Sequence, residues 1–204
     1  MISDKKYSVI IPTMWMSRKL EAMIPLYYEL ADEIIIIDNN PKKRFINDKR
    51  IRYLTEGHNI FVNPAWNWGV KESKNELLII ANDDVIIPRL PELMKIFADS
   101  NYDIIGSDIR RCRIDGEIRL HPEFQMQWGW GCFMMMRRYA YTPIPDQFKI
   151  WFGDNIIFLR NYIRGSFSGL QIITEMSETL RNGFMAQARS EEPLFRKWFN
   201  ENIG

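Results

Sequence analysis

The chain has 204 residues, enough for one globular domain with its own core; 46% of them are hydrophobic, and the formal net charge is +1. This charge balance gives no electrostatic case for nucleic acid as the main partner. The two cysteines form neither a metal cage nor a disulfide framework, and no stretch approaches the ~20 apolar residues of a membrane span. The N-terminus lacks the apolar core of a signal peptide, so we expect a cytoplasmic location.

In the first half of the chain, apolar runs of strand length alternate with helical patterns. Strands are predicted at residues 7–13, 33–38, 51–54, 77–81 and 103–106. Helices are expected after Ser17, after Asn63 and from Pro88 to Ser100, and Ser17 and Asn63 are good N-terminal caps. The alternation is typical of βαβ units, so the sequence predicts an α/β fold with a mostly parallel sheet flanked by helices.

The second half of the chain has a different character. Arg110 to Leu120 alternates around Asp115-Gly116, a pattern that predicts a β-hairpin. The run Trp128 to Met136 places methionines in the core, whereas its Gly-Trp-Gly part is either a β-bulge or a loop on which a ligand ring stacks. A short strand is expected at 170–174 and a final helix at 191–200, docked through Leu194, Phe195 and Trp198.

Carboxylates follow two of the predicted parallel strands. Asp38 ends the second strand, and Asp83 and Asp84 follow the run 77–81 directly. Because ligands bind outside the carboxyl ends of parallel strands, these acids are expected at one ligand-binding edge. Adjacent carboxylates favour a cation, and oxygen ligands suit Mg²⁺ or Mn²⁺; the alternative is a solvated turn.

Residues 151–160 are predicted to form a turn that enters another helix, with Asp154 at the helix N-terminus. The ordinary interpretation of an Asp in this position is a helix cap. The helix dipole favours its ionised form, which also suits a general base near neutral pH.

Several short motifs, in this order and spacing, resemble a family-2 glycosyltransferase with the GT-A fold, and the resemblance covers nearly the whole chain. It implies a single domain over residues 1–204, with a nucleotide-sugar-binding half at about 1–106 and an antiparallel, acceptor-binding portion at about 107–204. The motifs are Ser8–Thr13, Glu33–Asn39, Asn63–Gly69, the Asp-x-Asp segment Ala81–Asp84, the Gly-rich strand Gly129–Arg137, Gly153–Asn155, and the ending Phe195–Trp198.

The resemblance also implies roles for individual residues in an inverting transfer from a nucleotide-diphospho-sugar, with a UDP- or dTDP-sugar as the expected donor. Asp154 would deprotonate the hydroxyl of a glycan or other acceptor, and Trp130 and Gly131 would contact that acceptor. On the donor side, Pro12 and Thr13 would contact the nucleoside, Asp38 the base and Asp83 the ribose; Asn67 would support the pocket, and Asp84 would bind Mn²⁺ or Mg²⁺.

The chain departs from the resemblance in three respects. Many members have a metal-binding His near the C-terminal end, where this chain has Glu175, whose oxygens suit the same ions. The first position of the Asp-x-Asp segment is Asn82, which lowers its charge. The chain also stops early, so it is expected to be a minimal catalytic domain or a fragment of a longer protein.

Two other functions were weighed. A catalytically silent nucleotide-sugar-binding module of the same fold stays open as the alternative, because the His is missing. A sugar nucleotidyltransferase is set aside, since it needs a Gly-rich basic loop after the first strand, where this chain has Thr13 to Ser17 without a glycine.

Overall fold

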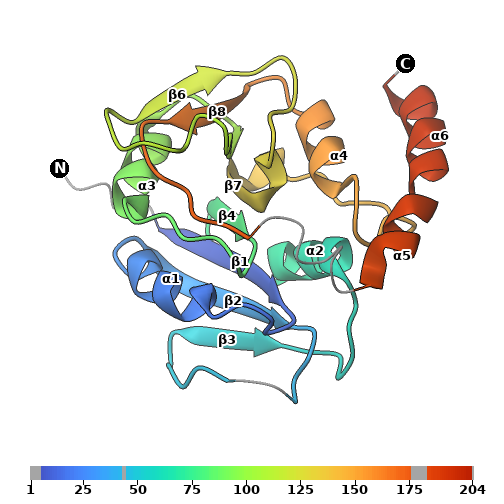
Figure 1. The fold of residues 1–204 in the computed structure, drawn as a ribbon, viewed down its shortest axis with the longest axis horizontal. Helices are drawn as coiled ribbons and strands as arrows, with labels where there is room; N and C mark the ends of the chain where they lie inside the picture. The colour runs from blue at the N-terminus through green and yellow to red at the C-terminus, as the bar shows by residue number, and fades with distance from the viewer. Residues whose placement is uncertain (1–5, 43–44, 176–182, 204) are drawn as a thin grey trace.

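The computed structural model describes residues 6–42, 45–175 and 183–203. Figure 1 shows a sheet with helices on both faces, and the helices nearest the C-terminus at one end of the molecule. The strands are β1 (Tyr7–Thr13), β2 (Ala31–Asp38), β3 (Ile51–Leu54), β4 (Leu77–Ala81), β5 (Ile104–Gly106), β6 (Arg119–Pro122), β7 (Phe133–Arg137) and β8 (Arg164–Ser168). The α-helices are α1 (Lys19–Tyr27), α2 (Val62–Glu72), α3 (Leu90–Asp99), α4 (Gly153–Arg160), α5 (Met185–Ser190) and α6 (Glu192–Asn202), with 3₁₀ turns η1 (Trp130–Cys132) and η2 (Arg138–Ala140).

One sheet of eight strands runs through both predicted halves, in the order β3-β2-β1-β4-β7-β5-β8-β6. The strands β1 to β4 are mutually parallel, as predicted, and Thr13 pairs with Asp38 at the carboxyl end of β1. β7 is antiparallel to both of its neighbours, β4 and β5. Its first residue therefore lies at the edge where the parallel strands end, and its last lies at the opposite edge.

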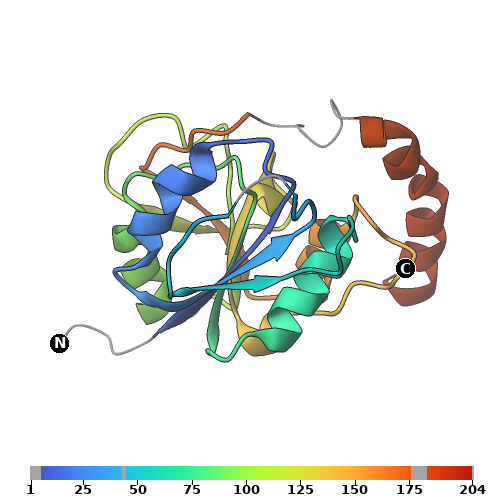
Figure 2. The same cartoon turned by 90° about the horizontal axis from the view of Figure 1, so that it is seen from below.

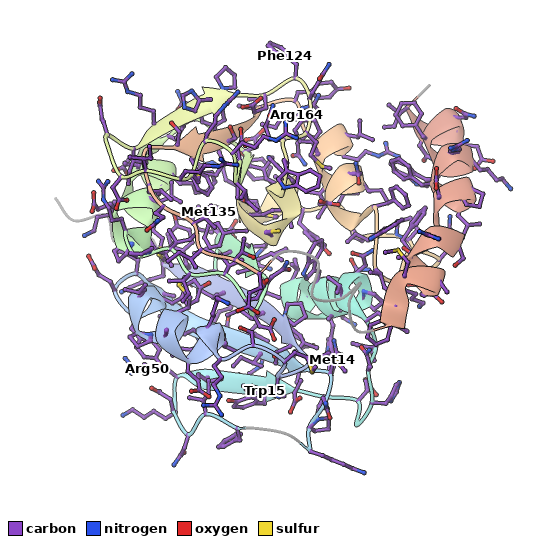
Figure 3. The ribbon with its side chains drawn as sticks, viewed as in Figure 1. Met14, Trp15, Arg50, Phe124, Met135 and Arg164 are labelled. Atoms are coloured by element: carbon purple, nitrogen blue, oxygen red, sulfur yellow. The ribbon has the colours of Figure 1, made fainter. Side chains whose placement is uncertain are left out.

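The sheet is buried on both faces because its central strands are apolar at consecutive positions. One core packs α1 and α3 against residues such as Val9 and Ile34, and the other packs α2 and α4 against Ile10 and Ile35. Figure 2 shows these two helical layers on opposite sides of the strands. The methionines of β7 are buried, as predicted, and Met135 lies in the interior of the molecule (Figure 3).

The predicted hairpin at 110–120 is wrong. The backbone N–H of Gly116 donates to the carbonyl of Gly169, 3.0 Å away, instead of turning the chain onto itself. Leu120 then pairs with Phe167 in β8. The alternation around Asp115-Gly116 is real in the sequence, but each side of the turn finds a partner far along the chain.

The predicted strand at 170–174 is also wrong. Within it, Ile173 forms one isolated bridge, with Ile86. The strand of this region is β8, whose glycine and serines carry no strand signal, although burial on the sheet makes it one. In the last helix, Trp198 is buried as expected, but Leu194 is 38% exposed. Across the described ranges, each helix is too short or too polar to traverse a lipid bilayer.

Candidate active site

The carboxyl ends of β1, β2 and β4 meet at one edge of the sheet, as predicted, and hydrogen bonds join them. The Thr13 hydroxyl, 2% exposed, donates to Asp83 Oδ2 and accepts from the backbone N–H of Trp15 at 2.8 Å. Pro12 lies one residue earlier within β1, paired with Ile37 of β2. Hydrogen bonds therefore join the residues at the ends of these strands before any ligand binds.

Asp38 is held by a residue that the sequence did not point to. Its Oδ1 accepts hydrogen bonds from the indole N–H of Trp15, at 2.8 Å, and from the backbone N–H of Asn40, at 3.0 Å. Trp15 has φ 59°, a backbone region that bulky residues rarely adopt, and its ring lies toward β3, near Tyr53 (Figure 3). A tryptophan just after a strand that ends in Pro-Thr was the available signal for this contact.

The carboxylate of Asp84 is 4% exposed and lies beside the segment in which a metal ligand was predicted. Its Oδ2 accepts from the Thr174 hydroxyl at 2.9 Å and from the backbone N–H of Glu175 at 3.1 Å. The side chain of Glu175 pairs with Lys19 of α1 instead. The structure thus brings the backbone of Glu175 to Asp84, while the Glu175 carboxylate pairs with the Lys19 ammonium group. Lys19 was not identified from the sequence.

Asp84 and its neighbours fit a metal ion that is held partly by the substrate better than one held by the protein alone. Among residues 6–42, 45–175 and 183–203, no three His, Cys, Asp or Glu side chains are grouped so that they could hold an ion. Mg²⁺, however, is usually bound through one or two carboxylates together with substrate phosphates and waters. Asp84 can supply such a carboxylate.

Asp154 lies in the first turn of α4, as predicted. Its Oδ1 accepts from the backbone N–H of Asn155 at 3.0 Å. Burial raises the pKa of Asp154, and the backbone N–H groups of Asn155, Asp154 and Gly131, which favour the charged form, offset only part of that effect. The peptide groups at the start of α4 thus favour the ionised form, as expected, but burial outweighs them and the pKa is raised.

The two acids of the predicted mechanism both lie near one short turn. A Cβ added to Gly131 would lie 2.4 Å from Asp154 Oδ2, so that only a glycine fits there. The backbone carbonyl of the next residue, Cys132, accepts a hydrogen bond from the backbone N–H of Asn82 at 2.9 Å. Burial raises the pKa of Cys132 to about 12, and the charges of Asp84 and Asp154 both add to the shift. Both carboxylates are therefore within electrostatic reach of one thiol.

Trp130, in contrast, is a core residue, the alternative that the Gly-Trp-Gly pattern left open. It is 1% exposed, and its indole N–H donates to the carbonyl of Gly165 at 3.0 Å. A Cβ on Gly106 would lie 2.3 Å from the ring. No face of this ring is left for a sugar in the structure, so the acceptor contact predicted for Trp130 is wrong.

The two asparagines of α2 have structural tasks. Asn67 donates to the carbonyl of Ile144 at 2.8 Å, and its Oδ1 accepts from the Ile144 N–H and the Tyr141 hydroxyl. It holds the chain that returns from the far edge of the sheet to Asp154. Asn63 lies within α2 and does not cap it; its side-chain amide donates to the carbonyl of Trp151 at 2.9 Å.

A pocket of about 520 Å³ lies beside the start of α2. The loop that forms one wall is joined to the end of β2, because Thr55 donates to the carbonyl of Asp38 and the Ile60 N–H donates to Asn39 Oδ1. One wall of the pocket is thus bonded to the residues that end β2. Its lining residues are Glu56, His58, Asn59, Ile60, Phe61, Pro64, Trp68 and Lys149.

Comparison with solved structures supports the same fold. The chain superimposes on S. aureus TarS 1–349 in complex with UDP-GlcNAc with a TM-score of 0.61 and 11% identity, over 82% of this chain and 57% of that one. For GalNAc-T7 with UDP, GalNAc and Mn²⁺, the TM-score is 0.59 and the identity 12%, over 82% of this chain and 42% of that one. For HddC from Yersinia pseudotuberculosis, the values are 0.55 and 12%, over 89% and 99%.

The sequence comparisons identify the family. No curated protein sequence matches the chain. The profile described as Glycosyl transferase family 2 matches residues 8–162, which contain the edge acids, the Gly131 turn and Asp154. The chain therefore belongs to glycosyltransferase family 2, and its fold is of the GT-A type.

Proposed function

We propose that the protein is an inverting glycosyltransferase that moves a sugar from a nucleoside diphosphate, UDP or dTDP, to an acceptor hydroxyl. The observation that carries the proposal is that Asp84 and Asp154, from distant parts of the chain, both lie near the Gly131-Cys132 turn. One acid can serve the leaving group while the other serves the attacking group. The UDP-GlcNAc bound to TarS and the UDP and Mn²⁺ bound to GalNAc-T7 support the donor class.

The donor side would hold the nucleotide through the connected edge. Asp38 would accept a hydrogen bond from an N–H of the base, and Thr13 and Asp83 would contact the nucleoside. Asp84 and the donor phosphates would hold Mn²⁺ or Mg²⁺, which when bound neutralises charge that develops on the leaving diphosphate. Lys19 lies close enough to pair with Glu175, and it adds positive charge to the same region.

On the acceptor side, Asp154 would act as the general base. The proton of the acceptor hydroxyl passes to Asp154 Oδ2 while its oxygen bonds to the anomeric carbon, and the bond from that carbon to the diphosphate breaks. Attack from the face opposite the leaving group inverts the anomeric configuration. A raised pKa suits this task, because a base is most effective when its pKa lies near the working pH.

The silent binding module is disfavoured by the same carboxylate. Placing an acid where burial raises its pKa costs folding free energy, and nucleotide binding alone has no use for it. Strained or costly groups concentrate at sites that do chemistry.

The proposal is tested by comparing the wild type with Asp154→Asn. With Mn²⁺, we expect UDP release from UDP-sugars or dTDP release from dTDP-sugars to fall by ~10²–10⁴-fold, the usual contribution of a general base. Nucleotide affinity, measured by calorimetry, should stay within about twofold. Equal turnover in the two proteins would contradict the role of Asp154, and a wild type that binds nucleotide without turnover would favour the silent module.

A further inference from the structure

At the N-terminal end of α6 there is a buried glutamate that the proposed reaction does not use. Glu191 is 0% exposed, and its carboxylate accepts hydrogen bonds from the backbone N–H groups of three consecutive residues. The distances are 2.9 Å to Lys149, 3.1 Å to Ile150 and 2.8 Å to Trp151. A buried charge is costly unless hydrogen bonds compensate it, and these peptide groups supply the compensation. The carboxylate therefore holds the 149–151 segment at a fixed place.

Aromatic packing holds the next residue. Phe195 of α6 stacks on Phe152, with ring centroids 4.3 Å apart and planes 8° from parallel. Phe152 has φ 64°, in the left-handed region, which a bulky residue adopts only at a cost in free energy. Such a conformation persists only when surrounding contacts impose it. Glu191 and Phe195 are contacts of that kind, and Gly153 and Asp154 follow directly.

The same segment is held from the other side by α2. The Asn63 backbone N–H donates to the carbonyl of Lys149 at 3.0 Å, and its side chain donates to the carbonyl of Trp151 at 2.9 Å. Among the residues that the structure describes, Asn63 Oδ1 has no hydrogen-bond partner although it is buried, and a Cβ on Gly153 would lie 2.2 Å from it. The segment 149–153 thus lies between two helices and has little room to shift.

We propose that Glu191 is a positioning residue for glycosyl transfer: by holding residues 149–151 it places Asp154 against Gly131. This rests on the proposed function, in which Asp154 is the base. The family profile ends at residue 162, so Glu191 acts from a part of the chain outside the matched segment. A positional error of about 1 Å at the reacting groups can cost ~10²-fold in rate, so one remote carboxylate can control turnover.

The test compares Glu191→Gln and Glu191→Asp with a matched control, Glu192→Gln. The neighbouring Glu192 is exposed and pairs with Arg196. Glu191→Gln keeps the size but turns an N–H donor toward the peptide N–H groups, and Glu191→Asp keeps the charge on a shorter side chain. Two quantities are measured: UDP or dTDP release from a panel of their sugars with Mn²⁺, and the titration of the Asp154 carboxyl by ¹³C NMR.

In Glu191→Gln we expect turnover to fall by ~10²-fold with nucleotide affinity unchanged, while Glu191→Asp recovers part of the loss. Because the loosened segment admits water, the pKa of Asp154 should move down toward its ordinary value in Glu191→Gln, and stay at the wild-type value in Glu192→Gln. A folded Glu191→Gln protein with wild-type turnover and wild-type titration would overturn the inference.

Two further outcomes also bear on the role of Glu191. If Glu191→Gln does not fold, the shorter Glu191→Asp must show the lower turnover and the shifted titration, and wild-type values there would overturn the inference. If the wild type turns over none of the donors, the proposed function fails. The NMR titration then still tests whether Glu191 positions Asp154.

Discussion

The two sides of the site are built in different ways. On the proposed donor side, the acids follow strands directly and are joined by side chains of the same edge, such as Thr13 to Asp83 and Trp15 to Asp38. On the proposed acceptor side, Asp154 depends on a long return segment held by α2 and α6. The donor side is thus a local construction, whereas the acceptor side depends on contacts between distant parts of the chain. Donor-side changes should therefore alter nucleotide affinity, and acceptor-side changes should alter turnover.

The largest effect is expected for Asp84→Asn, which would test the donor side. Loss of a carboxylate that shares an ion with the phosphates should weaken UDP binding in Mn²⁺ by ~10²-fold or more, which corresponds to about 2.7 kcal/mol or more. Calorimetry with UDP and with uridine measures it, and uridine affinity should not change because uridine has no phosphate. The exposed Asp146, changed to Asn, is the matched control. An equal loss for uridine would show that Asp84 acts on the pocket and not on the diphosphate.

A somewhat smaller effect is expected for Gly131→Ala, which would test the acceptor side. The added methyl group would meet Asp154 Oδ2 and Asp154 Cβ at 2.4 and 2.6 Å and displace the base. Turnover should fall by ~10²-fold while UDP affinity is kept. Gly116→Ala is the control, since a Cβ there has nothing within 4 Å. Should Gly131→Ala weaken UDP binding as strongly as turnover, the division between the two sides would be lost.

The smallest effect is a dependence on pH. Because the pKa of Asp154 is raised on folding, turnover should fall as the pH is lowered through that value, which lies above the ordinary ~3.9 of Asp. The free energy of unfolding depends on pH in the opposite direction from turnover. A raised carboxyl pKa favours the folded state below the unfolded-state pKa, and that advantage is lost as the pH rises through the folded-state pKa.

The Asp154→Asn protein should accordingly melt a few degrees above the wild type at neutral pH, and the difference should disappear or reverse near pH 3. Melting curves at both pH values measure this. A variant that is less stable than the wild type at neutral pH would show that the ionised carboxylate is well compensated where it lies.

The same difference between the sides explains what the sequence could predict. Strands β1, β2 and β4 and the acids that follow them could be predicted because an apolar run and its last residue are adjacent in the chain. The position of Asp154 at a helix N-terminus could be predicted from its neighbours in sequence, whereas its approach to the other acids was implied only by the resemblance to a family. Trp15, Lys19 and Glu191 were missed because their partners Asp38, Glu175 and Trp151 lie 23, 156 and 40 residues away.

Trp130 and Trp128 illustrate a second limit. The Gly-Trp-Gly pattern could not tell a core ring from a ring that contacts ligand, and Trp130 proved to be buried while Trp128 is 56% exposed. β8 shows a third, because its polar and glycine residues form a strand only through the pairing that the sheet provides. In each case the deciding interaction is tertiary, and no local pattern contains it.

The reversed direction of β7 has a consequence for how relatives with this arrangement can diverge. Its entry, near Cys132, opens onto the acids, while its exit at Arg137 opens onto the opposite edge of the sheet. Insertions in the segment before β7 would change the surroundings of the acids directly, whereas insertions just after Arg137 would begin at the opposite edge and reach the site only through the return segment that leads to Asp154. Grafting between homologues to exchange acceptor preference should therefore begin with the residues that enter this strand.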